Sequence, residues 1–185
     1  MPTVSDDKIR WLLLVYRVPS EPTRLRAAVW RRLKALGAIY LQNSAAAMPA
    51  SETAERALRT LRNEIGQMGG TAHLMRCDPL VAGADIVAAY NAARDDEYEE
   101  IEDRCHDFLT EIETETAAAH LTYAELEEND EDLRKLHGWL EKVVARDVLG
   151  ASRQNEAREA LVRCEEALSG FAARVYTAEE ENNGG

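Results

Sequence analysis

The sequence has few cysteines and few aromatic residues. Its three cysteines, Cys77, Cys105 and Cys164, are far apart and form no CxxC motif, which argues against a disulfide framework and favours reduced thiols. Aromatic residues make up 6% of the chain, whereas alanine and glutamate are abundant, and this composition favours helices. At 185 residues the chain can bury a sizeable core, as one large domain or two small ones.

Long apolar runs are also missing. No window approaches the roughly 18 uninterrupted apolar residues that a membrane span needs. The first ten residues include Asp6 and Asp7 where a secretion signal has basic residues, and the apolar run after them is too short for a signal peptide. We therefore expect a cytoplasmic protein that does not bind membranes.

Positive charge is scarce overall but concentrated near the start of the chain. The net charge is -12, yet residues 1–78 contain 12 Lys+Arg and 7 Asp+Glu, while residues 79–185 contain 10 and 27. An acidic chain is not expected to coat nucleic acid nonspecifically, because phosphate binding needs positive potential. A basic first part next to an acidic second part permits binding through one face only.

The first part of the chain alternates between strand and helix patterns. The first strand is short, apolar and followed by Pro19, so we expect it to be buried on both faces. One helix begins at Ser20–Pro22 and ends at Gly37, and another begins at Ser51 and ends at Gly69. The predicted strands are residues 11–18, 38–42, 45–48 and 71–77. This order predicts a ferredoxin-like βαββαβ domain over residues 1–80, with both helices on one face of an antiparallel sheet.

Beyond Asp78, only helices are predicted. Apolar residues recur every three or four positions in three segments, which predicts a three-helix antiparallel bundle or arm over residues 84–178. Thr122 and Glu125 form a capping-box pattern that starts a turn or short helix, with another helix beginning near Asp130. Residues 179–185 are expected to be disordered. The predicted fold class is therefore α+β.

The helix after Pro22 is rich in positive charge. Successive helical residues lie about 100° apart, so these cations flank the apolar stripe and face water. Guanidinium groups grip tetrahedral anions in bidentate fashion, which makes the cluster a candidate DNA- or anion-binding surface. The alternatives are a solvated face, or pairing with the acidic part of this or a neighbouring subunit. The candidate residues are Arg17, Arg24, Arg26, Arg31, Arg32 and Lys34.

Other chemistry-bearing residues give weaker signals. Trp30 could stack on a base, but we expect it to pack beneath the sheet or in a subunit interface. Cys77 ends a strand beside a basic residue and is the candidate reactive thiol. Asp103 and His106 have the i, i+3 spacing of di-iron bundles but no second copy, so no metal site is expected. No catalytic motif is found, and we expect no cofactor and no enzymatic activity.

The stretch WLLLVYRVPSEPTRLRAAVWRRLKALGAIYLQNS resembles the opening of the N-terminal domain of ChrB, the chromate-resistance regulator family. The segments HLTYAELEENDEDLRKLHGWLEKVVARDVLG and ALVRCEEALSGFAARVY continue the resemblance. The opening is also similar, more loosely, to the Cas2-like middle domain of PaaX-type repressors. Cas2-type nucleases use an aspartate at the end of the first strand, but here that strand ends in Tyr16 and Arg17, so phosphodiester hydrolysis is not expected.

The resemblance implies a cytoplasmic regulator of a chromate-efflux operon that binds promoter DNA and responds to chromate. The resemblance also implies a second, C-terminal domain in full-length family members. If that domain senses chromate, the expectation for this chain is that it depends on a partner for sensing or has lost it. Three hypotheses follow. The first is a regulator that binds DNA as a homodimer through its two basic helices. The others are a protein-interaction or oligomerisation module without DNA binding, and a protein that binds chromate or sulfate.

Overall fold

The computed structural model describes residues 9–183. Over this range the chain forms a four-stranded antiparallel sheet and five helices, and most residues are helical. The architecture is therefore mixed, with sheet and helix, and each predicted strand is confirmed to within one residue at either end. In chain order the elements are β1 (Trp11–Arg17), α1 (Arg24–Leu36), β2 (Ile39–Gln42), β3 (Ala45–Pro49), α2 (Glu52–Gln67), β4 (Thr71–Cys77), α3 (Gly83–Ala117), α4 (Tyr123–Arg146) and α5 (Gln154–Asn183).

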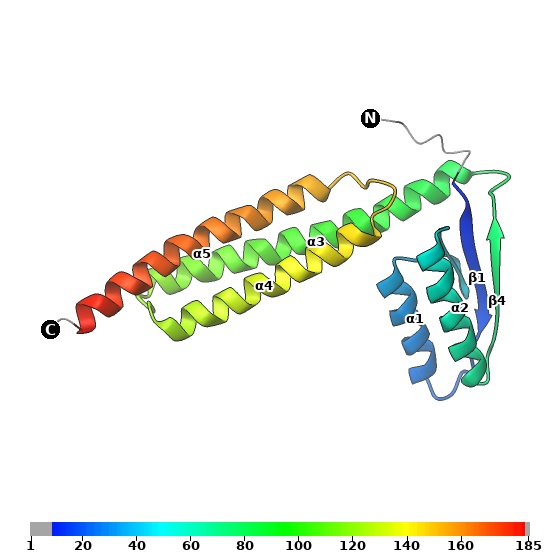
Figure 1. Ribbon diagram of the computed structural model, residues 1–185, viewed down its shortest axis with the longest axis horizontal. Coiled ribbons are helices and arrows are strands. Elements are labelled where there is room, and N and C mark those ends of the chain that lie inside the picture. The colour runs from blue at the N-terminus through cyan, green and yellow to red at the C-terminus, as the bar shows by residue number, and fades with distance from the viewer. Residues whose placement is uncertain (1–8, 184–185) are drawn as a thin grey trace. The chain divides into compact units, whose positions relative to one another are not determined.

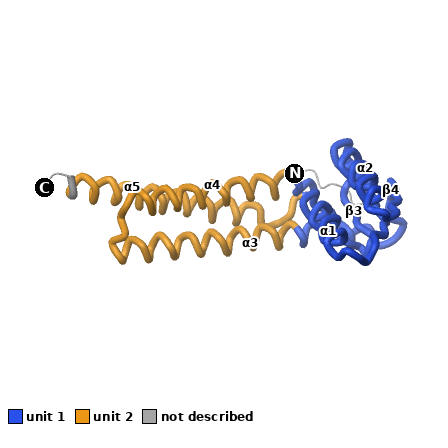
Figure 2. The backbone as a smooth tube through the Cα atoms, turned by 90° about the horizontal axis from the view of Figure 1, so that it is seen from below, with its two compact units in different colours: residues 1–93, 146–149 blue, residues 94–145, 150–185 orange. Residues whose placement is uncertain are grey.

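The chain divides into two compact units (Figure 2). Unit 1 comprises the chain up to Ala93 together with Arg146–Leu149, and unit 2 comprises the remainder. The division falls inside α3, whereas the sequence suggested a boundary between residues 80 and 84. The physical reason is Tyr90, which belongs to α3 but is 1% exposed and packs edge-on to Trp11 of β1, with ring centroids 5.9 Å apart. The first turns of α3 are therefore part of the core of unit 1.

Unit 1 is built on a sheet whose strands run in the order β2-β3-β1-β4, with every neighbouring pair antiparallel. Both α1 and α2 lie on the same face of this sheet (Figure 1). Leu14 in the central strand β1 faces them and is fully buried, paired with Ala46 on one side and Leu74 on the other. The order along the sheet thus places β2 and β4 at its two edges.

The expectation that β1 is buried on both faces is only partly right. Its alternate side chains point to opposite faces of the sheet. Leu12 and Leu14 are buried beneath the helices, and Trp11 is buried by α3, but Val15 on the face of Trp11 is 38% exposed. The apolar run in the sequence therefore did not show whether both faces of the strand are covered along its whole length or along only part of it.

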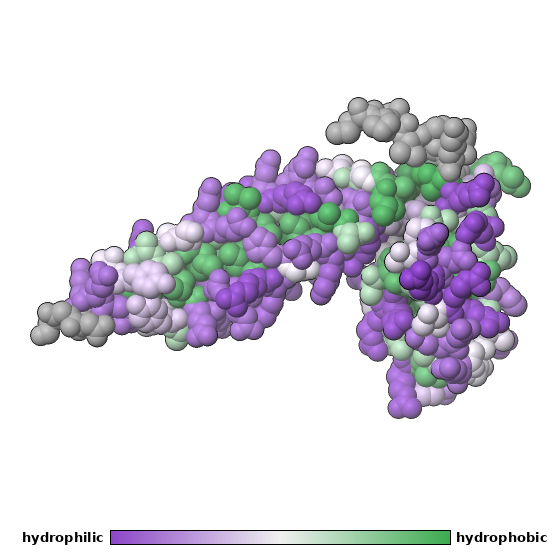
Figure 3. All heavy atoms as spheres, viewed as in Figure 1, coloured by the Kyte–Doolittle hydropathy of each residue, from purple (hydrophilic) through white to green (hydrophobic). Residues whose placement is uncertain are grey.

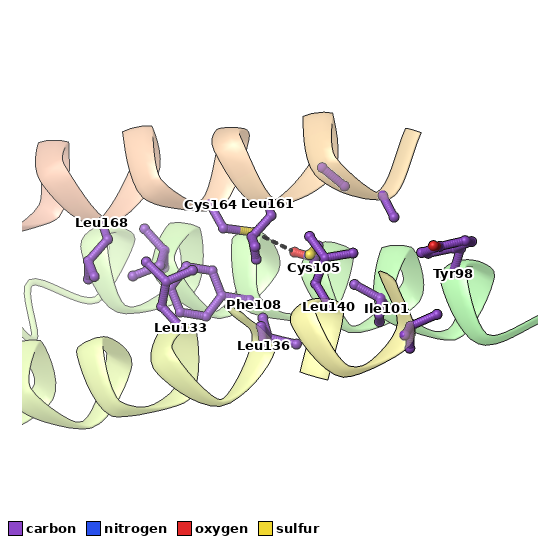
Figure 4. Close-up of a cluster of buried hydrophobic side chains, with 14 of the residues drawn as sticks. Tyr98, Ile101, Cys105, Phe108, Leu133, Leu136, Leu140, Leu161, Cys164 and Leu168 are labelled. Carbon is purple, nitrogen blue, oxygen red and sulfur yellow. Dashed lines mark hydrogen bonds between the residues drawn. The ribbon is translucent and has the colours of Figure 1, made fainter. Parts of the chain in front are cut away.

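The helices of unit 2 are α4 up to Ala145, α5, and the part of α3 from Arg94 onward. Each runs antiparallel to its neighbour in sequence (Figure 1). The predicted apolar stripes form its core. Phe108, Leu136 and Leu161, one from each helix, point toward one another between the helices (Figure 4). Next to them the Cys164 thiol donates a hydrogen bond to the backbone carbonyl of Cys105, at 3.5 Å. Both cysteines are buried and free, as expected for reduced thiols that act as small apolar residues.

Two helix boundaries in unit 2 differ from the sequence expectation. The capping residue Thr122 accepts a hydrogen bond from the Glu125 N–H at 3.3 Å, but the helix it begins is α4 itself, which continues without a break past Asp130. At the other end, α5 continues to Asn183, so residues 179–183 are helical and not disordered. Residues 184–185 lie outside the described range. A helix already anchored by a packed stripe extends through a polar tail at little cost per residue.

The loop before α5 is held by a carboxylate from α3. Asp95 accepts a hydrogen bond from the Arg153 backbone N–H at 2.8 Å and another from the Ser152 hydroxyl at 2.9 Å. The Arg153 guanidinium in turn donates two hydrogen bonds to the Glu102 carboxylate, at 3.0 and 3.1 Å. These contacts satisfy polar groups at the start of α5 and set its position along α3.

Within residues 9–183, no helix combines the length and the apolar character needed to cross a bilayer.

Glu115 in α3 gives a prediction for the pH dependence of stability. Burial raises the pKa of its carboxyl group, and the hydrogen bond donated by Asn129 Nδ2 at 2.7 Å offsets this only in part. The folded state therefore binds the proton more tightly than the unfolded chain does. Its contribution to the free energy of unfolding is expected to decline as pH rises from the ordinary glutamate pKa through the higher folded value.

The test is denaturant unfolding between pH 4 and 8, comparing wild type with Glu115→Gln. The variant is expected to lack this part of the decline, while Glu113→Gln, which alters an exposed carboxylate on the same helix, leaves the pH profile unchanged. Parallel profiles for wild type and Glu115→Gln would show that the carboxyl group titrates normally.

Candidate nucleic-acid interface

The basic cluster predicted from the sequence lies on α1. Val29 and Leu33 of this helix are fully buried in the core of unit 1, which fixes the side of the helix that faces the sheet. Gly37 ends the helix in a left-handed conformation, with φ of 83°. Much of the rest of the helix faces solvent, and five predicted cations are exposed there. These are Arg24, Arg26, Arg31, Arg32 and Lys34.

Most of this positive charge has no carboxylate partner. α1 itself contains no aspartate or glutamate. Among residues 9–183, the cluster forms one ion pair, between Arg32 and Glu64 on α2 at 3.3 Å. Both side chains are partly exposed, so water and salt weaken that pair. The other four cations of α1 are exposed to solvent and form no ion pair within residues 9–183. The alternative that the cluster pairs within the chain therefore does not hold for them.

Arg17 does not belong to the same surface. It is exposed at the end of β1, directly opposite Thr71. Side chains alternate along a strand, so Arg17 lies on the sheet face opposite to Leu12 and Leu14, which α1 and α2 cover. The structure therefore brings together the five cations of α1 and leaves the sixth candidate on the other face.

Trp30 does not pack beneath the sheet. Its side chain is 49% exposed on the solvent face of α1. The Lys34 ammonium group, one helical turn later, lies 5.2 Å from the centre of its ring, within the range of a cation–π interaction. An aromatic ring is thus held among exposed cations, which is the arrangement that lets a protein stack on a base while contacting phosphate.

The sequence interpretation missed a second row of arginines on α2. Arg56, Arg59 and Arg62 recur every three residues and are all exposed. α2 contains as many glutamates as arginines, so its composition is neutral and did not draw attention. The three-residue spacing was the available signal, since residues three apart lie side by side on a helix. Both α1 and α2 therefore present arginines to solvent.

The candidate thiol Cys77 lies at the end of β4 and is partly buried. Burial raises the pKa of the Cys77 thiol, and the negative charge of Asp78 raises it further. A reactive cysteine needs the opposite shift, because the thiolate is the nucleophile. Among the described residues, no group of three or more His, Cys, Asp or Glu side chains is arranged to hold a metal ion.

The arrangement on α1 is suited to binding anions that carry several charges. Exposed guanidinium groups form paired hydrogen bonds with phosphate oxygens, and a helix is narrow enough to enter the major groove of DNA. A single small anion would engage only one or two of these side chains, because the cluster extends over about three turns of helix. A polyanion lying along the exposed side of the helix could contact several of these side chains at once.

Comparison with known proteins agrees with the resemblance noted in the sequence. The model of the family described as "Protein ChrB, N-terminal" matches residues 26–182, which include most of α1 and all of α2 to α4. No curated protein is a significant match to the chain. Because the family model covers most of the chain, the protein belongs to the ChrB N-terminal family, which is linked to chromate resistance.

Proposed function

We propose that this protein is a cytoplasmic transcriptional regulator of chromate resistance that binds promoter DNA through α1. The observation that supports this most directly is the exposed face of α1, with five cations, no carboxylate of its own and one weak ion pair. The family membership supplies the link to chromate. A role in binding, without catalysis, fits the end of β1, where Tyr16 and Arg17 stand in place of a metal-binding carboxylate.

We also propose that unit 1 is a ferredoxin-like, Cas2-like domain. The order β1-α1-β2-β3-α2-β4, with the sheet order β2-β3-β1-β4, is consistent with a ferredoxin-like, Cas2-like domain. Domains of this kind commonly pair, and we propose a homodimer whose two α1 helices contact a palindromic site. Such a dimer doubles the number of phosphate contacts, which would raise both affinity and its sensitivity to salt.

A second candidate function is an oligomerisation module in which the acidic unit 2 of one copy binds the basic α1 of another. The observation that favours it is a groove of about 640 Å³ between α4 and α5, whose lining includes Leu133, Leu168 and the acidic Glu127. Tyr123 and Tyr176 at this groove stack edge-on and are each about half exposed. Figure 3 shows apolar side chains along unit 2 between rows of hydrophilic ones.

The experiment that separates the two is a mobility-shift titration with the DNA immediately upstream of the protein's own gene, with and without chromate. The regulator proposal expects a shift at lower protein concentration than for unrelated DNA of equal length, and a change in affinity when chromate is added. Equal affinity for both DNAs would contradict it. No shift, together with self-association in sedimentation that weakens with salt, would instead support the oligomerisation module.

A further inference from the structure

The strand β4 has a free edge. It pairs with β1 on one side and is the last strand of the sheet, with no neighbour on its other side among the described residues (Figure 1). Its pairing with β1 is continuous over seven residues, from Thr71 to Cys77, without a bulge. It contains neither proline nor lysine, which often protect an edge, and its arginine, Arg76, is paired with Glu55 of α2. An extended peptide could therefore pair with the backbone of this strand.

A groove follows this free edge. It has a volume of about 910 Å³ and lies between β4 and α2, so it belongs wholly to unit 1. Its floor includes Leu12 and Leu74 of the sheet, and its far wall is formed by Arg59 and Arg62 of α2. A strand lying beside a helix with a groove between them is the arrangement used to bind peptides by β-strand addition.

The groove has an excess of positive charge. Arg59 and Arg76 both donate hydrogen bonds to the Glu55 carboxylate, and these bonds lower the pKa of Glu55, that from Arg59 having the larger effect. One carboxylate thus accepts hydrogen bonds from two arginines and neutralises only one of their two positive charges. Arg62 has a hydrogen bond to the amide oxygen of Asn63, at 3.3 Å, and lies outside the Glu55 network. Three arginines and one glutamate leave the lining with a net charge of about +2.

We propose that this groove binds an acidic peptide segment of a partner protein, which adds as a strand to the free edge of β4. The inference does not depend on DNA binding by α1. Side chains alternate along a strand, so acidic residues at every second position would face the arginines of α2. The intervening residues would lie beside His73 and Met75, and Met75 is a 44% exposed apolar side chain outside the core cluster of unit 1.

Charge argues against a second copy of the chain as the occupant. Pairing β4 with β4 across a two-fold axis would bring the same arginines of both copies close together. An acidic segment removes that repulsion and satisfies the backbone groups of the edge at the same time. The partner is therefore identified by two features, an extended backbone and carboxylates at alternate positions.

The test uses the full chain and a fluorescent seven-residue peptide that alternates glutamate and valine. Binding is expected to be saturable, to weaken with salt, and to slow amide hydrogen exchange at β4. Two further peptides, N-methylated on alternate residues in the two opposite phases, separate strand addition from charge attraction. One is expected to lose binding and the other to retain it, because only one phase donates hydrogen bonds to β4.

The double variant Arg59→Ala/Arg62→Ala is expected to weaken peptide binding at least tenfold. The matched control, Arg158→Ala/Arg174→Ala, removes two exposed arginines from α5 and is expected to leave it unchanged. Equal binding of both N-methylated peptides, or equal losses in the two variants, would overturn the proposal. So would the absence of binding by the parent peptide. These assays contain no DNA, so none of these three results would bear on the proposal that α1 binds DNA.

Discussion

The double variant Arg24→Ala/Arg31→Ala is expected to bind promoter DNA roughly 10- to 100-fold more weakly than wild type near 0.1 M salt. The two side chains are seven residues apart, so they lie two turns apart on one face of α1. Both are exposed and neither has an ion pair among the described residues. Each is therefore free to neutralise a phosphate, and removing both also removes the release of the counterions that accompanies binding.

Fluorescence anisotropy with labelled promoter DNA measures this effect. The loss is expected to be similar for specific and unrelated DNA, because contacts to phosphate do not depend on base sequence. Alanine favours helix at least as well as arginine, so the melting temperature is expected to stay within a few degrees of wild type. The control Arg158→Ala/Arg174→Ala alters net charge equally. If the control lost as much affinity as the α1 variant, overall charge and not α1 would explain binding.

Replacing Leu33 with alanine is expected to lower the free energy of unfolding of unit 1 by about 2–5 kcal/mol. Leu33 lies on the buried face of α1 and is 0% exposed in the core cluster that includes Leu14 and Leu58. Its removal leaves a cavity beneath the helix that presents the arginines. The substitution therefore weakens the packing that holds α1 on the sheet. DNA affinity is expected to fall only under conditions in which unit 1 begins to unfold.

Chemical denaturation followed by circular dichroism measures the change. Leu80→Ala is the matched control, because Leu80 in the same unit is 98% exposed, and its effect is expected to stay within about 0.5 kcal/mol. A Leu33→Ala protein as stable as the Leu80→Ala protein would show that α1 is not held by this packing. The basic surface would then have no fixed position relative to the sheet.

Much of the fold could be predicted because local patterns and tertiary packing agree. A short apolar run before Pro19 located β1, and the segment after the helix stop at Gly69 located β4. Gly37 marked the end of α1, where only a residue tolerant of positive φ fits easily. The alanine-rich strand β3 was the least expected from propensity. Ala46 and Ala47 point to opposite faces of the sheet and are nonetheless both buried, because β3 is an inner strand between β1 and β2.

The features that could not be predicted depend on contacts distant in sequence. Tyr90 joins the first turns of α3 to unit 1 by packing on Trp11, and Asp95 holds the start of α5 from 58 residues away. Neither contact produces a recognisable pattern in the sequence around the residues that form it. The exposure of Trp30 could not be predicted for a related reason, since an aromatic residue on a helix is buried only if another element covers that side.

The candidate site was predicted in part. The cations of α1 were identified because they lie within eleven residues of sequence that contain no acidic residue. Arg76 was considered only as the neighbour of Cys77 and not as part of a basic surface, because it is a single cation on a strand. Only the fold places it beside Glu55, which also pairs with Arg59 of α2. The lining of the groove at the free edge of β4 includes all three of these residues.

The central claim is that the open positive charge of α1 meets the phosphates of DNA. The most direct test is the logarithm of the DNA association constant plotted against the logarithm of salt concentration. Each phosphate neutralised contributes a slope of about -0.9, so the four cations of α1 without an ion pair predict roughly -3 to -4 for one helix and about twice that for a dimer. A slope near zero, or one that Arg24→Ala/Arg31→Ala leaves unchanged, would contradict the account.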